Sequence, residues 1–318
     1  MLANLKGVLT IVLLTLNVIF WFVPIFIIAV LKLVLPVAGW RRLTSRWLTW
    51  FGEHWVRCNQ GIFAITQNIA WDIRGVESLQ PRDWYLVVSN HRSWVDILIL
   101  QGVFVGHIPF LKFFIKQQLR WVPFLGLAWW AMDMPFMKRY TREQIERDPS
   151  LKGRDLATTR RACEKFRTMP TSIINFVEGT RYTPAKKQER SSPYEHLLPP
   201  RAGGIAFVLS AMGDILHRLL DVTIVYRPAS PSLWDLCTGK LERVVVHVRE
   251  RPIERWLVEG DYLESPEFRD AFQRWLTGVW SEKDALIGGL LEEPGMRGLE
   301  PGHRGMAGVE SRESGSSR

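Results

Sequence analysis

His91 and Asp96 are the residues of this chain whose types and spacing best suit acid–base catalysis. They lie five positions apart in Asn90-His91-Arg92-Ser93-Trp94-Val95-Asp96. Histidine titrates near neutral pH and can accept a proton from a hydroxyl group. A carboxylate bonded to the second ring nitrogen would fix the tautomer and stabilise the imidazolium. The pair therefore indicates general-base chemistry, although this spacing alone is common and is also typical of a structural histidine.

A second motif, Phe176-Val177-Glu178-Gly179-Thr180-Arg181, has the residue types of an anion site. Arg181 carries a planar fork of donors that suits a phosphate group, and Gly179 lets backbone amides come close to a ligand. We expect Glu178 to orient Arg181 or to bond a substrate hydroxyl. The alternative for such a turn is a solvated loop with a salt bridge.

Two apolar segments are expected to position these motifs. Residues Trp84–Ser89 and Thr171–Val177 are predicted to be buried strands, and each ends at a motif. Positions i and i+5 do not share a helix face, so His91 and Asp96 can meet only if His91 precedes the helix expected from Trp94 to Phe104. Because ligand sites of α/β folds gather at strand ends, both motifs are expected to line one site.

The remainder of the chain continues the alternation of helices and strands. A helix is predicted over Ile205–Leu220, strands over Val222–Tyr226 and Val244–Val248, and a closing helix over Phe268–Leu291. This order predicts one α/β domain over residues 80–291, with a central mixed sheet covered by helices. Residues 292–318 contain almost no large apolar side chain and are predicted to be a disordered tail.

The N-terminal segment has the composition of a membrane anchor. Gly7 to Leu31 is a run of 25 residues without a charged side chain, long enough to cross a hydrocarbon core as a helix. Pro24 would also allow a kinked hairpin that enters and leaves one leaflet. We therefore assign residues 1–38 to an anchor, either a helix or a hairpin. The basic residues that follow it predict that the rest of the chain lies on the cytoplasmic side of the membrane.

Residues 39–79 begin with a segment rich in Trp, Phe and Arg in which Leu43, Trp47, Leu48 and Phe51 recur at helical spacing. The pattern predicts either a helix at the lipid headgroups or a core helix of the domain.

Composition limits the functional classes that need to be considered. The net charge of +9 suits anionic lipid surfaces, phosphorylated substrates or nucleic acid. The basic residues form no recognisable nucleic-acid motif, so no nucleic-acid partner is expected. The three cysteines, Cys58, Cys163 and Cys237, are scattered without metal-like spacing, which indicates a reducing compartment and no metal site.

The two motifs resemble the first and third signature blocks of the glycerolipid acyltransferases, in the lysophosphatidate acyltransferase-like, membrane-anchored bacterial subgroup. Phe136-Met137-Lys138-Arg139 is similar to the second block, and Lys116-Gln117-Gln118-Leu119 to a stretch that lines the site. The resemblance covers roughly residues 80 to 230. Two stretches depart from it: Met134-Pro135 stands where the second block has Gly, and Val222–Pro228 lacks the Val-Pro pattern of the fourth block.

The resemblance implies transfer of a fatty acyl group from a thioester, acyl-CoA or acyl carrier protein, to the free hydroxyl of lysophosphatidate. His91 would be the general base and Asp96 its partner. Arg139 and Arg181 would bind the phosphate, Glu178, Gly179 and Thr180 would shape that pocket, and Lys116 would lie near the reacting groups. No cofactor is expected, and the partners are the two lipid substrates, membrane lipids and, with that donor, acyl carrier protein.

Three alternatives stay open at this point. The first is another lysophospholipid as acceptor, which would make the reaction phospholipid remodelling. The second is a non-catalytic lipid-binding protein of the same fold. The third, a metal-dependent phosphoesterase, would need further ligands, but His107, His196, His217 and His247 are scattered singly.

Overall fold

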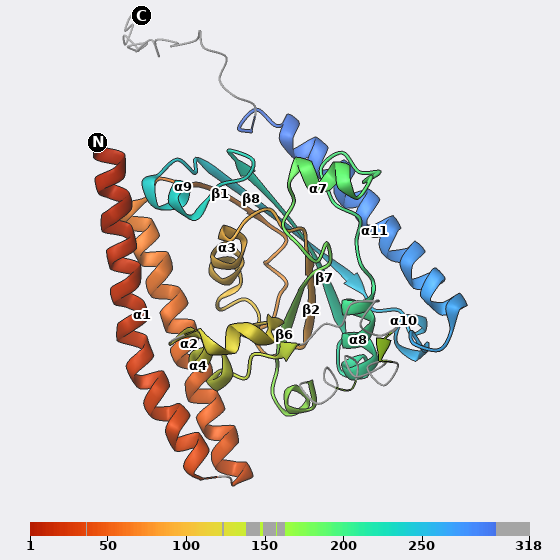
Figure 1. Ribbon diagram of the computed structural model, residues 1–318, viewed down its shortest axis with the longest axis horizontal. Coiled ribbons are helices and arrows are strands. Elements are labelled where there is room, and N and C mark those ends of the chain that lie inside the picture. The colour runs from red at the N-terminus through yellow and green to blue at the C-terminus, as the bar shows by residue number, and fades with distance from the viewer. Residues whose placement is uncertain (36, 123, 138–146, 149–156, 158–162, 297–318) are drawn as a thin grey trace, which may run out of the picture.

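The computed structural model describes residues 1–35, 37–122, 124–137, 147–148, 157 and 163–296. Its centre is a six-stranded mixed sheet, as the alternation of elements predicts (Figure 1). In spatial order the strands are β1 (Ala70–Arg74), β8 (Arg243–Pro252), β7 (Arg218–Arg227), β2 (Tyr85–Ser89), β6 (Ser172–Phe176) and β3 (Leu111–Phe113). All neighbours are parallel except β7 and β8, which are antiparallel.

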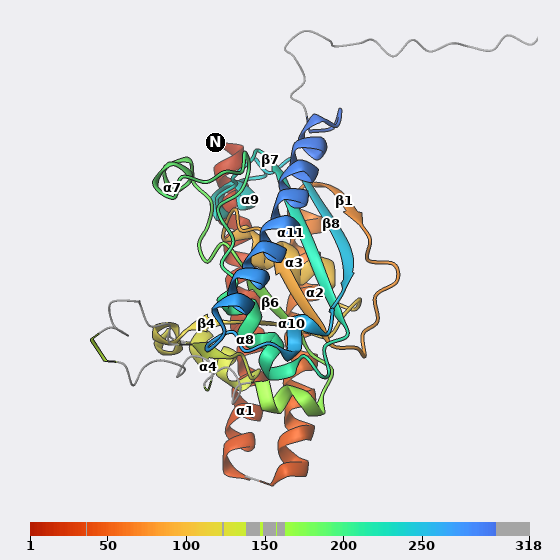
Figure 2. The ribbon, with the colours of Figure 1, turned by 90° about the vertical axis from the view of Figure 1, so that its right-hand side faces the viewer.

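Helices cover both faces of the sheet (Figures 1 and 2). Side chains of successive strand residues point to opposite faces. Accordingly, Leu86 and Val88 of β2 belong to the core under α8 (Gly203–Met212) and α11 (Pro266–Glu292). Tyr85 and Val87 belong to the core under α3 (Val95–Phe104). Since every residue of β2 is buried, this strand is fixed from both sides, which holds the motif at its end in place.

The remaining elements are short. They are β4 (Ile115–Lys116) and β5 (Phe136–Met137), which form a separate parallel pair, the 3-10 helices η1 (Gln117–Trp121) and η3 (Lys165–Thr168), and the helices α4 (Leu125–Ala131), α7 (Pro184–Glu189), α9 (Leu233–Thr238) and α10 (Trp256–Glu259).

Two long helices precede the sheet and lie side by side as a hairpin (Figures 1 and 2). α1 (Leu2–Val34) is continuous through Pro24. Of the two predicted forms of the anchor, the hairpin that turns at Pro24 is therefore wrong. The chain instead returns as α2 (Ala38–Thr66). Asn17 Nδ2 of α1 donates to Asn59 Oδ1 of α2 at 2.9 Å, which pins the two helices in register.

α2 is also a core helix of the domain. Leu48, Val56 and Phe63 are buried, and Phe63 packs in the core that α3 covers. The spacing in the sequence therefore predicted the helix correctly, and its inner face serves the domain.

One predicted helix extends too far. The helix expected over Ile205–Leu220 ends at Met212, and Arg218 to Leu220 already belong to β7. The apolar pair Leu219 and Leu220 is paired in register with Leu86 and Val87 of β2. A short apolar run suits a buried helix and a buried strand equally, and here the pairing partner on β2 decides.

Candidate active site

His91 and Asp96 meet at the carboxyl end of β2, as the strand–turn–helix prediction requires. His91 lies in the turn after β2, and Asp96 lies in the first turn of α3. His91 Nδ1 is 2.7 Å from Asp96 Oδ2, and the Asp96 side chain is completely buried. Because an ionised carboxylate only accepts hydrogen bonds, Nδ1 carries the hydrogen. The Nε2 lone pair is then available to take a proton from a substrate.

Asp96 is held from several sides at once. Its Oδ2 also accepts from the backbone amides of Arg92 at 2.6 Å and Ser93 at 3.0 Å. Its Oδ1 accepts from the hydroxyl of Tyr226 on β7 at 2.7 Å. Burial raises the pKa of Tyr226 well above its usual value, and Asp96 raises it further. Tyr226 therefore stays protonated and remains a donor to the carboxylate.

The turn that carries His91 is anchored to β7. The buried Asn90 side chain donates to the carbonyl of Ile224 at 2.9 Å and accepts from the amide of Ile224 at 2.8 Å. The His91 ring stacks on Phe176, the last residue of β6, with ring centroids 4.0 Å apart and an angle of 17° between the rings. The ring is thus fixed by Asp96 at one edge and by Phe176 on one face.

The second motif forms a tight turn directly beside the first. Gly179 has φ 69°, a left-handed conformation that side chains with a Cβ adopt at a cost, and its amide bonds to the carbonyl of Phe176 at 2.9 Å. The amide of Tyr182 donates to the carbonyl of His91 at 2.7 Å. The two motifs are therefore parts of one site, and the glycine is needed for the turn itself.

Glu178 holds the backbone around the site together. Its buried carboxylate accepts from the amides of His91 at 3.0 Å and Leu198 at 3.2 Å. Burial raises the pKa of Glu178 to about 7, against the opposing effect of the two amides and of Arg92. The hydrogen bonds of its carboxylate thus go to backbone amides of neighbouring segments, where we had expected Arg181 or a substrate hydroxyl.

Arg181 projects next to the same turn. Its guanidinium carbon lies 4.7 Å from the centre of the Trp94 ring, a cation–π contact. Lys186 of α7 adds a second cation, donating to Thr180 Oγ1 at 2.7 Å and to the carbonyl of Arg181 at 3.1 Å. Two cations therefore lie at the turn of the second motif, an arrangement that suits an anion.

Two of the predicted site residues are less clearly placed. Lys116 is exposed on β4, and within the described residues no hydrogen bond or ion pair joins it to His91 or Asp96. Its register partner on β5 is Met137. Arg139 lies outside the described residues.

Sequence reasoning missed several residues of the site. Asn90 belongs to the first motif, but its role as an anchor to β7 depends on a contact with Ile224, which lies 134 positions away in the sequence. Phe176 is the last residue of β6 and Tyr226 the last but one of β7. Because β7 also contains Asp221 and Thr223, no local pattern distinguished Tyr226.

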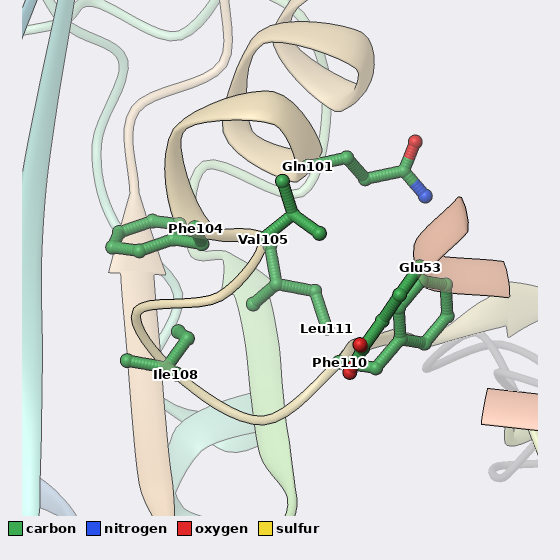
Figure 3. A pocket seen from close by; sticks show the side chains of 7 residues that line it. All are labelled: Glu53, Gln101, Phe104, Val105, Ile108, Phe110 and Leu111. Atoms are coloured by element: carbon green, nitrogen blue, oxygen red, sulfur yellow. The ribbon is translucent and has the colours of Figure 1, made fainter. Parts of the chain in front are cut away.

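The described part of the chain contains no group of three or more His, Cys, Asp or Glu side chains that could hold a metal ion. It does contain a small pocket at the far end of α3 from Asp96 (Figure 3). The lining comprises Glu53, Gln101, Phe104, Val105, Ile108, Phe110 and Leu111. Its volume of about 10 Å³ holds at most about one water molecule, so it is too small for a substrate chain.

The geometry shows an α/β protein with a hydrogen-bonded His–Asp pair and nearby cations at the carboxyl ends of parallel strands. Comparison with known proteins shows what this arrangement resembles. Residues 71–227 match the family model described as Acyltransferase. The mouse protein 1-acyl-sn-glycerol-3-phosphate acyltransferase delta is 28% identical over 212 residues, which cover 63% of this chain and 51% of that protein. An uncharacterized acyltransferase of Schizosaccharomyces pombe is 26% identical over 231 residues, covering 65% and 60% of the two chains.

The crystal structure of the 1-acyl-sn-glycerophosphate (LPA) acyltransferase PlsC from Thermotoga maritima aligns with a TM-score of 0.49 at 15% identity, covering 88% of this chain and 98% of that one. The chain matches only about half the length of its mammalian relative.

Over residues 71–227 the chain is thus similar to the acyltransferase family, and the motifs agree with that similarity. The matches support the glycerolipid, lysophosphatidate acyltransferase-like type within that family, the type that the name of the mouse relative states.

Proposed function

We propose that this protein transfers a fatty acyl group from a thioester to the free hydroxyl of lysophosphatidate, forming phosphatidate. The observation that carries the proposal is the His91 Nδ1–Asp96 Oδ2 bond of 2.7 Å, which leaves Nε2 available as a base, while Arg181 lies over Trp94 of the motif that contains His91. The names of the relatives support lysophosphatidate as the acceptor. The donor is a thioester of coenzyme A or of acyl carrier protein.

The reaction needs one proton transfer in each direction. His91 Nε2 takes the proton of the glycerol hydroxyl as the oxygen attacks the thioester carbonyl. The new C–O bond forms, the C–S bond breaks, and the imidazolium returns the proton to the departing sulfur. Asp96 stabilises the imidazolium between these steps. No covalent enzyme intermediate is required.

The phosphate of the acceptor would be bound on the Arg181 side of His91. The cation–π contact with Trp94 uses the face of the guanidinium, so its hydrogen-bonding edges stay free for phosphate oxygens. Arg139 is assigned to the same phosphate by its motif alone. Lys186 adds positive charge to the turn.

We further propose that α1 holds the protein at a membrane. It is the one described helix long and apolar enough to cross a bilayer, and large apolar side chains are exposed along its length. A lysolipid and an acyl chain could then reach the site while their tails stay in lipid. We place the site on the cytoplasmic side of the inner membrane.

The test is acyl transfer from oleoyl-CoA, and separately from oleoyl-acyl carrier protein, by membranes that contain the protein. Lysophosphatidate is compared with lysophospholipids that carry larger headgroups. We expect phosphatidate from lysophosphatidate, and a loss of about 10²–10⁴-fold in His91→Ala. His217→Ala, which removes an exposed histidine elsewhere, is the matched control.

Each outcome decides a different point. Product from other lysolipids in preference to lysophosphatidate would move the role to phospholipid remodelling with the same mechanism. An undiminished rate in a folded His91→Ala variant would exclude His91 as the base. No product from any acceptor with either donor would favour a lipid-binding role without catalysis.

A further inference from the structure

We propose that Tyr226 is a positioning residue that sets the pH at which the His91–Asp96 pair becomes active. The inference rests on the proposed function, because it concerns the base of that reaction. Tyr226 lies outside both motifs, on β7, in the stretch where the chain departs from the fourth block of its family.

The contact is direct and fully enclosed. The Tyr226 hydroxyl donates to Asp96 Oδ1 at 2.7 Å, and the two residues are 1% and 0% exposed. Asp96 Oδ2 is occupied by His91 and by the amides of Arg92 and Ser93. Tyr226 is therefore the side chain that serves the other oxygen of the carboxylate.

The proton affinity of a buried carboxylate depends strongly on the hydrogen-bond donors to its oxygens. A hydrogen bond to the ionised form favours that form, and a carboxylate without such a bond in a desolvated site tends to hold a proton. Without the Tyr226 hydroxyl, Oδ1 would keep no hydrogen bond from the described residues. The His91–Asp96 pair would then retain its proton up to a higher pH, and less of the enzyme would have a free Nε2.

Other charged groups act on the same pair and would remain in place. Arg92 and Glu178 lie on the two motif segments, and Arg92 acts electrostatically on both Asp96 and Tyr226. Along β7, Asp221 is paired with the buried Lys283 of α11 at 2.6 Å. Removing one hydroxyl changes none of these, so a shift can be assigned to the Tyr226–Asp96 bond.

Tyr226→Phe is the decisive variant because it deletes the hydroxyl and keeps the ring in the core. Tyr85→Phe is the matched control. Tyr85 is also fully buried in the same core, and its hydroxyl accepts from the amide of Gln80 at 2.9 Å. It stands at the start of β2, at the opposite end of the strand from His91.

The experiment measures kcat/KM for lysophosphatidate from pH 5.5 to 9.5. We expect the acid limb of Tyr226→Phe to move up by about one pH unit. The rate would then fall about tenfold on the acid side, and most of it would return above pH 9. Tyr85→Phe should keep the wild-type profile. A Tyr226→Phe enzyme with an unmoved limb and an equal loss at every pH would reduce Tyr226 to a packing residue and overturn the proposal.

A second readout does not need activity. Titration of the His91 ring by NMR, with labelled histidine and His91→Ala for assignment, should show a higher midpoint in Tyr226→Phe than in wild type. If wild type makes no product with any acceptor, the proposed function fails, while this titration still decides the role of Tyr226. An unchanged midpoint would refute it independently of the reaction.

Discussion

Glu178 places a carboxylate in the interior between the two motifs, where it bonds two backbone amides. Burial raises the pKa of Glu178 to about 7 from 4.5. A carboxyl group whose pKa is raised by folding stabilises the folded state fully below the unfolded pKa. That contribution is lost as the pH rises through the folded value. Glu178 therefore favours the folded state below about pH 4.5 and loses this effect between pH 4.5 and about 7.

The prediction at this scale concerns Glu178→Gln, which cannot ionise. As the pH rises from 4.5 to 8, the Glu178 carboxyl should lower the free energy of unfolding of wild type by an amount on the order of 3 kcal/mol. Glu178→Gln should not show this decrease. Thermal unfolding in detergent at several pH values, compared between wild type and variant, measures it. Glu189→Gln, an exposed substitution on α7, should behave like wild type. A pH dependence in Glu178→Gln that equals that of wild type would contradict the assignment.

The site residues that could be predicted are those whose chemistry is written in a local motif. His91, Asp96, Glu178, Gly179, Thr180 and Arg181 do come together, because each motif follows a strand and both strands end at the same edge of the sheet. Tyr226 and Trp94 act through contacts with residues 130 and 87 positions away. Such pairs depend on strand order, which no local pattern states.

At the scale of elements, the turn after β2 and the turn after β6 are joined by three ring contacts. His91 stacks on Phe176, the Arg92 guanidinium lies 4.4 Å from the centre of the Tyr182 ring, and that of Arg181 lies over Trp94. Each contact pairs one residue of the first segment with one of the second. The two turns therefore hold His91, the proposed base, and Arg181, the proposed phosphate ligand, in one fixed arrangement.

Trp94→Ala tests this arrangement through Arg181. Loss of a cation–π contact at an exposed site costs about 0.5–1 kcal/mol, so we expect KM for lysophosphatidate to rise about two- to fivefold with kcat little changed. Measured in an Arg181→Ala background, the same substitution should have no further effect on KM. Trp47→Ala, which removes an exposed tryptophan of α2, controls for general effects on lipid contact. An equal rise in both backgrounds would show that Trp94 acts independently of Arg181.

Helices and strands could be predicted from the sequence where the spacing of apolar residues clearly follows either the helix period or the strand period. The two strands that end at the motifs and the helices α2, α3 and α11 follow the apolar spacing closely. The boundary between α8 and β7 could not be predicted, because a short apolar run such as Leu219-Leu220 fits a helix and a strand equally well. The edge strand β1 was also missed, since its side chains are largely exposed and only its pairing with β8 defines it.

At the scale of the whole molecule, the hairpin of α1 and α2 would determine how the site meets the membrane that we propose. The outer side of α1 exposes apolar residues from Leu5 through Leu16 and Phe20 to Ile27, while its polar contacts point inward. Lys32 of α1 is tied to Asp133 of the domain at 2.7 Å, and Ser45 of α2 donates to the same carboxylate at 3.0 Å. Both helices of the hairpin are thus fastened to the domain near their turn, and the hairpin has one apolar side.

This attachment favours an α1 that lies in one leaflet over one that crosses the bilayer. α2 runs alongside α1 and carries Arg42, Arg46 and Glu53. Crossing would draw such charges toward the hydrocarbon at about 2.5–3.5 kcal/mol each near its centre. Lying flat would bury the apolar side of α1 and leave α2 and the sheet at the headgroups.

Labelling from one side of the membrane distinguishes the two arrangements. In a Cys58→Ser background, Ala3→Cys reports on the start of α1 and Glu254→Cys on the domain, and both positions are exposed. With a membrane-impermeant maleimide on inverted membrane vesicles, a helix in one leaflet predicts that both cysteines are labelled without detergent. A crossing helix predicts labelling of Glu254→Cys alone, with Ala3→Cys reacting only after the vesicles are opened. Because one reagent and one preparation report on both positions, the Glu254→Cys signal also verifies that the reagent reaches the face that carries the domain.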